Sequence, residues 1–262
     1  MNDMKNVKNM DLLKKYNAVY DEGSSGFFTT NGFAESKLLL DLIPNWNGLN
    51  VLEIGCGEGN LAAMLSFAGA KKVDAIDYSI EAINIAKRRI IIENVSYTCM
   101  GYQDVTGTYD VVALQGVLEH LDNSFEALTQ IIETNLNDNG KVILTTPSFL
   151  NPRGYIWMTL QLLFNVPMSL TDLNFMCPFD FVEFCSQNGY ILETIKSTEQ
   201  DWGAGDLAIV DLKERLTNAL RDAGMDNSNV DKLLAWLQKA VRYHHRDELS
   251  GAIVGYMISK KK

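Results

Sequence analysis

The sequence predicts an α/β protein built on a doubly wound, mostly parallel sheet of seven strands, with helical lid insertions. Short apolar segments alternate with helical segments five times between residues 34 and 147. This alternation is typical of strand–helix–strand units in a parallel sheet. Two more strand-like segments follow after residue 178, and 47% of the 262 residues are hydrophobic. A chain of this size and composition can bury one large core.

The predicted elements can be placed by apolar pattern and by breaker residues. Strands are expected at 49–55, 71–79, 95–101, 109–116, 140–147, 190–198 and 251–259. Helices are expected at 34–43, 60–69, 79–90, 124–136, 178–189, 206–224 and 229–243. Pro44 ends the first helix, Gly69 closes the second, and Ser79 is a plausible N-cap of the third.

The regular alternation divides the chain into four parts. Residues 1–33 are expected to form an N-terminal arm or lid, and residues 34–147 a nucleotide-binding core. Residues 148–177 interrupt the pattern, and residues 178–262 complete the sheet, with a helical insertion at 206–243. On that insertion, Leu212, Leu216 and Leu220 form a stripe at helical spacing, which predicts an intramolecular core rather than a dimer face. The oligomeric state stays open between monomer and homodimer.

Charge and cysteine usage narrow the class of protein. The net charge is −10 and no basic stripe is present, so a nucleic-acid partner is not expected. The cysteines at 56, 99, 177 and 185 form no C-x-x-C pair, which predicts no metal site and a reducing, cytoplasmic location. The N-terminus is too polar for a secretory signal. The longest apolar run, 155–164, is shorter than the roughly 20 residues that span a bilayer.

A glycine turn at residues 55–59 follows the first predicted strand. Its spacing is G-x-G-x-G, whereas dinucleotide folds carry G-x-G-x-x-G, which here would place Asn60 at the third glycine. Glu53 precedes the turn, where a carboxylate would repel a pyrophosphate and attract an ammonium or a sulfonium. Asp77 ends the next strand, where a carboxylate can accept hydrogen bonds from ribose hydroxyls. The turn therefore predicts a nucleoside ligand without a pyrophosphate.

Three segments occur together in a familiar order: VLEIGCGEGNL, AIDYS and YDVVALQGVLEHL. In these segments the sequence resembles class I S-adenosylmethionine-dependent methyltransferases, and most closely the small-molecule branch that includes the ubiquinone-biosynthesis O-methyltransferases. The resemblance covers residues 35–150. It implies a Rossmann-like methyltransferase fold, in which the last strand is antiparallel to the sixth. It also implies S-adenosylmethionine as the cofactor and S-adenosylhomocysteine as the product.

The resemblance also implies cofactor contacts. Glu53, Gly55, Cys56, Gly57 and the backbone of Gln115 would line the methionine end of the cofactor. Asp77 would hold the ribose, and Tyr78 or Ser79 would lie beside the adenine. Relatives carry G-D-A after the third strand, but here the run is GYQDV, so Tyr102, Gln103 and Asp104 are all candidates for the adenine. The alternative interpretation is that the glycines serve only a tight turn and that Cys56 is a small apolar filler.

Methyl transfer is an in-line displacement, so the protein must align the reactants and in some cases remove a proton. His120 is the predicted base, because a free imidazole titrates near neutral pH. The alternative is a histidine that packs the start of a helix. Glu119 has the alternative role of an acidic residue at a helix N-terminus.

Acceptor recognition is expected from insertions at the carboxyl ends of the strands. The candidates are Arg153, Tyr155 and Trp157 in the 148–177 segment, Tyr16 and Tyr20 in the N-terminal arm, and Trp202. The alternative is a capping helix that only covers the sheet.

The predicted function is methyl transfer to an oxygen or nitrogen of a small polar metabolite or sugar, as in cell-surface polysaccharide or secondary-metabolite biosynthesis. A lipophilic, quinone-like acceptor is the alternative, given the apolar run at 155–164. An NAD(P)-dependent reductase is an alternative from another class of protein. The sequence argues against it, because it lacks the third glycine of the dinucleotide motif and a convincing Tyr-x-x-x-Lys pair. A non-catalytic nucleotide-binding module stays open. Methylation of nucleic-acid bases is disfavoured, because LQGV stands where an acid or Asn followed by Pro-Pro-aromatic is expected.

Overall fold

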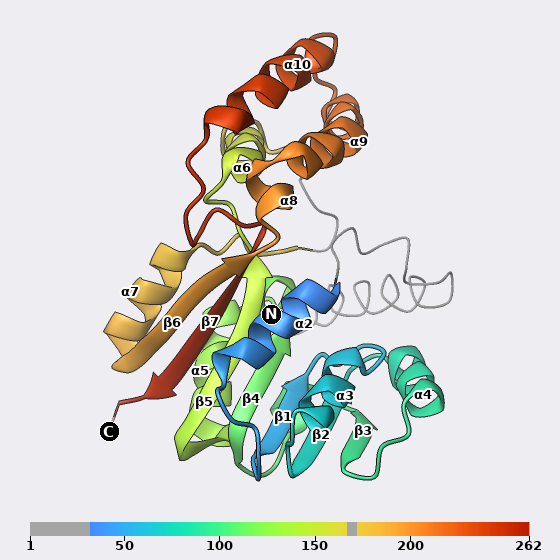
Figure 1. Ribbon diagram of the computed structural model, residues 1–262, viewed down its shortest axis with the longest axis vertical. Coiled ribbons are helices and arrows are strands. Elements are labelled where there is room, and N and C mark those ends of the chain that lie inside the picture. The colour runs from blue at the N-terminus through green and yellow to red at the C-terminus, as the bar shows by residue number, and fades with distance from the viewer. Residues whose placement is uncertain (1–31, 167–171, 262) are drawn as a thin grey trace, which may run out of the picture.

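The computed structural model describes residues 32–166 and 172–261, and this part of the chain contains a seven-stranded sheet (Figure 1). The strand order is β3-β2-β1-β4-β5-β7-β6. The strands are β1 Asn50–Ile54, β2 Lys72–Asp77, β3 Val95–Cys99, β4 Tyr109–Gln115, β5 Leu136–Pro147, β6 Tyr190–Thr198 and β7 Ile253–Lys260. The first five pair in parallel, and β7 is antiparallel to both β5 and β6. The predicted doubly wound sheet with an antiparallel last strand is confirmed.

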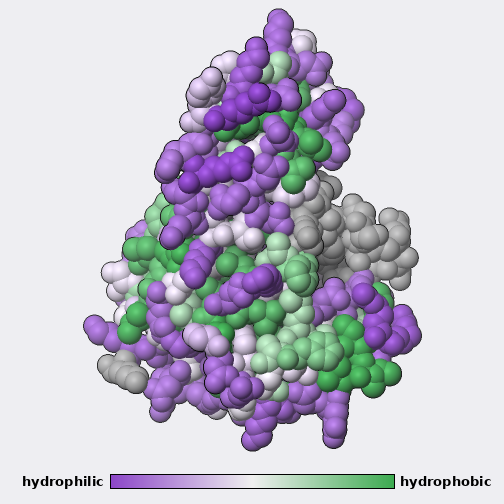
Figure 2. All heavy atoms as spheres, in the orientation of Figure 1, coloured by the Kyte–Doolittle hydropathy of each residue, from purple (hydrophilic) through white to green (hydrophobic). Residues whose placement is uncertain are grey.

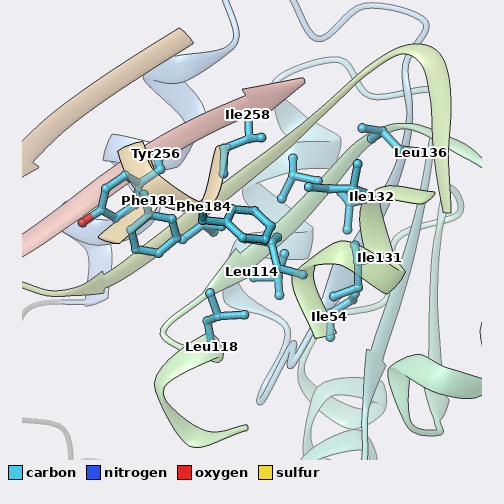
Figure 3. Packing of buried hydrophobic residues seen from close by; sticks show 14 of the residues in the cluster. Ile54, Leu114, Leu118, Ile131, Ile132, Leu136, Phe181, Phe184, Tyr256 and Ile258 are labelled. Carbon is cyan, nitrogen blue, oxygen red and sulfur yellow. The ribbon is translucent and has the colours of Figure 1, made fainter. Parts of the chain in front are cut away.

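Helices cover both faces of the sheet. On one face lie α2 Gly32–Leu42, α3 Asn60–Phe67 and α4 Ile80–Arg89, and on the other lie α5 Ser124–Asn135 and α7 Pro178–Asn188. The central strands are therefore buried on both sides, as their continuous apolar runs predict. Figure 3 shows the α5/α7 side, where the ring of Phe181 stacks on that of Tyr256 with centroids 3.9 Å apart.

The start of β5 differs from the prediction. The strand begins at Leu136 rather than at Gly140, and the pairing shifts between Tyr109–Leu136 and Val111–Lys141. A Cβ on Gly140 would lie 2.9 Å from the side chain of Leu136 and from the carbonyl oxygen of Tyr109. Glycine allows this close approach, and a bulge there extends the strand beyond the predicted start.

A helical cap lies beyond the carboxyl ends of β5 and β6 (Figure 1). It consists of α6 Pro152–Phe164, α8 Gln200–Ala204, α9 Asp206–Asp222 and α10 Val230–Ala240. Both strands are antiparallel to β7, so both deliver their following helices to the same edge of the sheet. The cap has its own core, in which Leu212, Leu216 and Leu220 are buried as predicted. The two predicted insertions are therefore parts of one cap, whose visible face is mostly hydrophilic (Figure 2).

Three short 3-10 helices complete the described chain: η2 Tyr102–Asp104, η3 Leu118–His120 and η4 Val241–Tyr243. The first two follow β3 and β4, at the edge of the sheet where the glycine turn lies. Across residues 32–166 and 172–261, no helix combines the length and the apolar character needed to cross a membrane.

Candidate active site

The glycine turn after β1 is held by backbone geometry that glycine alone adopts easily. Gly55, Gly57 and Gly59 have φ angles of 72°, 52° and 84°, in the left-handed region that penalises a side chain. A Cβ on Gly55 would collide with Cγ2 of Val117, and one on Gly59 would lie 2.6 Å from the hydroxyl of Tyr97. The turn therefore exposes backbone at the carboxyl end of β1 and packs closely against the chain that follows β4.

Asp77, at the end of β2, joins the glycine turn to the start of α4. Its Oδ2 accepts a hydrogen bond from the backbone of Gly57 at 2.9 Å, and its Oδ1 accepts one from Ser79 at 2.8 Å. Burial raises the pKa of this carboxyl, and the backbone N–H groups of Ser79, Gly57 and Tyr78 oppose the rise. Each oxygen has a further lone pair, so Asp77 can also accept bonds from a ligand's hydroxyls. Ser79 caps α4 as predicted, accepting from Ala82 at 3.2 Å.

Glu53 is a buried carboxyl that is not fully paired. It is 2% exposed, and among the described residues its Oε2 has no hydrogen-bond partner. Burial raises its pKa well above the usual range, the charge of Asp77 adds to the rise, and the backbone of Ala62 opposes it. An unsatisfied buried carboxyl costs free energy, so a ligand that brings a donor or a positive charge would find a partner here. The residues present therefore fit a cationic nucleoside.

Cys56 is buried, whereas the candidates for the adenine contact lie at the edge of the sheet. Cys56 is buried in the hydrophobic core beside α3, and burial raises the pKa of its thiol, which disfavours the nucleophilic thiolate. The segment 102–104 forms η2 at the end of β3, next to the end of β2, because the two strands are neighbours. Tyr78 is 41% exposed at the same edge. The geometry brings these residues to one region and leaves the choice among 102–104 open.

The side chain of Gln115 is committed to α2. Its Oε1 accepts from Ser36 at 2.7 Å, and its Nε2 donates to Glu35 at 3.4 Å and to the carbonyl of Gly32 at 3.5 Å. These bonds hold the side chain within the protein, and the contact between the Gln115 backbone and the cofactor, which the family resemblance implies, stays a prediction.

His120 lies at the end of η3, the short 3-10 helix that precedes α5. Its Nδ1 is 3.4 Å from Oδ1 of Asp172, and the two side chains are 19% and 20% exposed. Hydrogen bonds hold the chain after Asp172 against η3 and the residue that follows it. Leu173 and Asn174 donate their backbone N–H to the carbonyl of Glu119 at 2.8 and 3.1 Å, and the Asn174 side chain donates to Leu121 at 2.6 Å.

Two further carboxyls lie at this edge and were not assigned a ligand role from the sequence. Glu119 is 4% exposed, and within the described part of the chain its Oε2 lacks a partner. Glu35, on α2, accepts a hydrogen bond from the Thr145 hydroxyl at 2.6 Å. The "LEH" run contains Glu119, so its position was visible in the sequence. Nothing local marks Glu35, which reaches the site only through the packing of α2.

The predicted acceptor residues are dispersed. Arg153 and Trp157 are buried inside the cap, where Asp211 lies 3.7 Å from Arg153 and the Arg215 guanidinium lies 5.0 Å from the centre of the Trp157 ring. Their described contacts are therefore structural. Tyr155 is 53% exposed on α6, and Trp202 is partly buried on α8. Tyr16 and Tyr20 lie outside the described residues. No group of three potential metal ligands occurs in residues 32–166 and 172–261.

Comparison with known proteins agrees with this geometry. Residues 31–195 match the family model described as "Methyltransferase domain", and because this is more than half of the chain, the chain belongs to that family. It is a class I S-adenosylmethionine-dependent methyltransferase, with S-adenosylmethionine as its cofactor.

Among the curated relatives, the ubiquinone biosynthesis O-methyltransferase of Neisseria meningitidis serogroup C is 27% identical over 203 residues, or 67% of this chain and 84% of the relative. Among solved structures, the chain is similar to a methyltransferase solved with the Haloferax volcanii Trm112 activator, with a TM-score of 0.65 at 13% identity over 94% of this chain and 98% of that one. A methyltransferase from Listeria monocytogenes gives a TM-score of 0.55 at 16% identity, covering 88% and 100%. These structural similarities support the fold.

Proposed function

We propose that this enzyme methylates an oxygen, or a nitrogen, of a small-molecule acceptor, and that His120 removes the acceptor's proton. The observation that supports this most directly is the contact between Gly55 and Val117. Val117 directly precedes η3, so the start of η3 lies against the glycine turn. His120, three residues after Val117, ends η3. A base in that position can reach an acceptor held beside the turn.

The cofactor residues divide into two roles. Glu53, Gly55 and Gly57 hold the methionine end, with the Glu53 carboxylate offering a negative charge to positive groups. Asp77 accepts hydrogen bonds from the ribose while it keeps the turn and α4 together. When bound, S-adenosylmethionine supplies an electrophilic methyl group on a sulfonium.

His120 and Asp172 act as a pair in this proposal. The carboxylate of Asp172 orients the imidazole through Nδ1, so that the ring can take up the acceptor's proton. An adjacent carboxylate also stabilises the imidazolium that forms when the proton moves. The cap, which lies at the same edge of the sheet, supplies walls that exclude water and orient the acceptor.

A hydroxyl-bearing aromatic acceptor is the first to test, because the Neisseria relative is named for ubiquinone biosynthesis and for O-methylation. A small polar metabolite or sugar is the second candidate, supported by the polar and carboxyl-rich surroundings of η3.

Calorimetric titration with S-adenosylhomocysteine, NADH and NADPH tests the cofactor assignment. We expect binding of S-adenosylhomocysteine alone, and its loss in Asp77→Ala. Formation of S-adenosylhomocysteine with a panel of catechols, with and without an isoprenoid tail, and of sugars then tests the acceptor. Binding of a nicotinamide nucleotide instead would refute the proposal.

A further inference from the structure

Two carboxyl groups flank one point at the carboxyl end of β4. A Cβ built on Gly116 would lie 3.6 Å from Oε1 of Glu119 and 3.7 Å from Oε1 of Glu35. Glu119 comes from η3 and Glu35 from α2, so two distant segments of the chain deliver acids to the same place. Gly116 has a φ of 60°, and with no side chain of its own it leaves the space between the carboxyls free of a Cβ.

The two acids differ in how they are satisfied. Oε1 of Glu35 accepts from the Thr145 hydroxyl at 2.6 Å, and that hydroxyl in turn accepts from the backbone of Gly116 at 3.1 Å. Oε2 of Glu119 has no partner among the described residues, although Glu119 is only 4% exposed. Buried polar atoms in proteins are nearly always hydrogen-bonded. An orphaned carboxyl oxygen beside a second acid therefore indicates a donor ligand.

The charges around the pair favour a cation. Burial raises the pKa of both carboxyls; the charges of Asp172 and Glu35 add to the rise at Glu119, and the charge of Glu199 adds to it at Glu35. None of the ion pairs formed by the described residues gives Glu35, Glu119 or Glu199 a lysine or arginine partner. A neutral hydroxyl would satisfy one oxygen and leave the mutual repulsion of the acids in place. An ammonium brings three donors and a compensating charge.

The position of the pair ties it to the transfer reaction. Gly116 directly follows Gln115, whose backbone is the implied neighbour of the cofactor's methionine part, and the next residue, Val117, contacts Gly55. A group held between the two acids would therefore lie beside the methyl donor. It would also lie close to His120, which is on the same short segment as Gly116 and Glu119.

We propose that Glu119 and Glu35 form an acceptor subsite that binds a protonated amine of the molecule to be methylated. This inference rests on the proposed function and narrows its acceptor to amine-bearing molecules. Glu119 is the principal contact and Glu35, fixed by Thr145, is the second. The amine is the recognised group, and the methylated atom is the one that His120 deprotonates.

Amine binding has a consequence that a purely structural role for Glu119 would not have. Burial and neighbouring acids raise the pKa of both carboxyls in the empty subsite. A bound ammonium favours the ionised form and lowers those pKa values, so the protein releases protons when the amine binds. The released protons can be counted by titration in buffers of different ionisation enthalpy.

The test compares tyramine with 4-propylphenol, which has the same phenol and a methyl group in place of the ammonium. Each is titrated calorimetrically into the full chain saturated with S-adenosylhomocysteine. We expect tyramine to bind at least about tenfold more tightly, as a charge-assisted hydrogen bond predicts, with proton release. Glu119→Gln should abolish both the preference and the proton release. Glu126→Gln, on an exposed glutamate of α5, should keep both.

Three results would overturn the subsite. The first is equal affinity for the two phenols, or no binding of tyramine. The second is magnesium chloride binding that depends on Glu119 and excludes tyramine, because the acids would then serve a metal. The third is an unchanged tyramine preference in Glu119→Gln. Each of these results can be distinguished from failure of the proposed function. If the proposed function is wrong, the wild-type protein will not bind S-adenosylhomocysteine.

Discussion

Nδ1 of His120 lies 3.4 Å from Oδ1 of Asp172, although 51 positions of the chain separate η3 from the segment before α7. The backbone carbonyl of Glu119 fixes this relationship by accepting two N–H bonds from residues 173 and 174. The carboxylate is therefore held by backbone hydrogen bonds on one side of the imidazole. The proposed role of His120 as a base therefore includes Asp172 as the residue that positions its ring.

Replacing His120 by Gln should lower kcat and leave cofactor binding intact. A positioned general base contributes roughly 10²- to 10⁴-fold to the rate, so we expect a loss in that range. The affinity for S-adenosylhomocysteine should stay within about twofold of the wild type, since the glycine turn is untouched. A variant with normal kcat would show that His120 only packs η3.

Replacing Asp172 by Asn tests the positioning role through the pH profile. A neighbouring carboxylate raises the pKa of an imidazole by stabilising its charged form. Its removal should therefore move the acidic limb of the kcat profile to lower pH and reduce the plateau by a smaller factor than His120→Gln does. An unchanged limb with a lowered plateau would indicate a structural role for Asp172.

Replacing Asp77 by Ala should weaken binding of S-adenosylhomocysteine by at least about 100-fold. In the proposed complex the ribose hydroxyls lose a charged acceptor, and such bonds are worth about 1.5–3 kcal/mol each. The turn also loses the bonds that Gly57 and Ser79 donate to Asp77. Asp74→Ala is the matched control, because Asp74 lies on the same strand and bonds to Lys72 and Ser96 instead. Equal affinity for the ligand in both variants would contradict the assignment of Asp77.

Two features favour glycine at position 59: the positive φ angle of the backbone and the lack of room for a Cβ beside Tyr97. Gly59→Ala and Gly48→Ala place the same side chain at φ angles of 84° and 81°, but only the first meets another residue, Tyr97. Both should lower the free energy of unfolding through the left-handed backbone. Gly59→Ala should cost about 1–3 kcal/mol more, the usual penalty for overpacking. Urea unfolding of the two variants measures the difference, and equal losses would show that the contact with Tyr97 relaxes freely.

The site residues that could be predicted from the sequence are those that belong to local sequence motifs. Glu53 lies one residue before the end of β1 and Asp77 ends β2, which is its neighbour. Parallel strands bring their carboxyl ends to one edge of the sheet, so spacing alone predicts that the two acids lie at the same edge. Glu35 and Asp172 reach the site by the packing of α2 and of the segment before α7. No local pattern marks either of them, because their role depends on tertiary contacts between distant segments.

Composition alone does not distinguish between two roles for Arg153 and Trp157, a ligand contact and a packing contact. A cationic and an aromatic side chain in an insertion suit a ligand pocket and suit the core of a helical cap equally well. The deciding residue is Asp211, which lies on another insertion and pairs with Arg153 and Arg215. No local pattern predicts that the two insertions share one core, because that core forms only by contacts between distant segments.

Asp211→Ala should destabilise the cap strongly. Its carboxylate is 1% exposed and compensates Arg153, whose burial lowers the pKa of its guanidinium. Removing one partner of a buried pair costs about 3–5 kcal/mol. Asp222→Ala breaks an exposed pair with Arg221 and should change the free energy of unfolding by less than about 1 kcal/mol. Similar unfolding curves for the two variants would contradict the buried-pair interpretation.

The ligand-free protein should lose stability as the pH rises through the carboxyl range, and Glu119 should account for part of the loss. Its pKa is raised well above the usual 4.5 by burial and by the charges of Asp172 and Glu35. Above pH 4.5 the unfolded chain therefore releases a proton that the folded chain retains. Because the unfolded state then binds fewer protons, the free energy of unfolding falls with increasing pH until the folded carboxyl also ionises.

Glu119→Gln mimics the protonated carboxyl and removes its share of this pH dependence. The variant and the wild type should be similarly stable below pH 4.5, and the variant should become the more stable of the two as the pH rises. Urea unfolding of the ligand-free proteins over a series of pH values measures the two slopes. Glu126→Gln should follow the wild type at every pH. Parallel curves for Glu119→Gln and the wild type would contradict a raised pKa of Glu119 in the ligand-free folded protein.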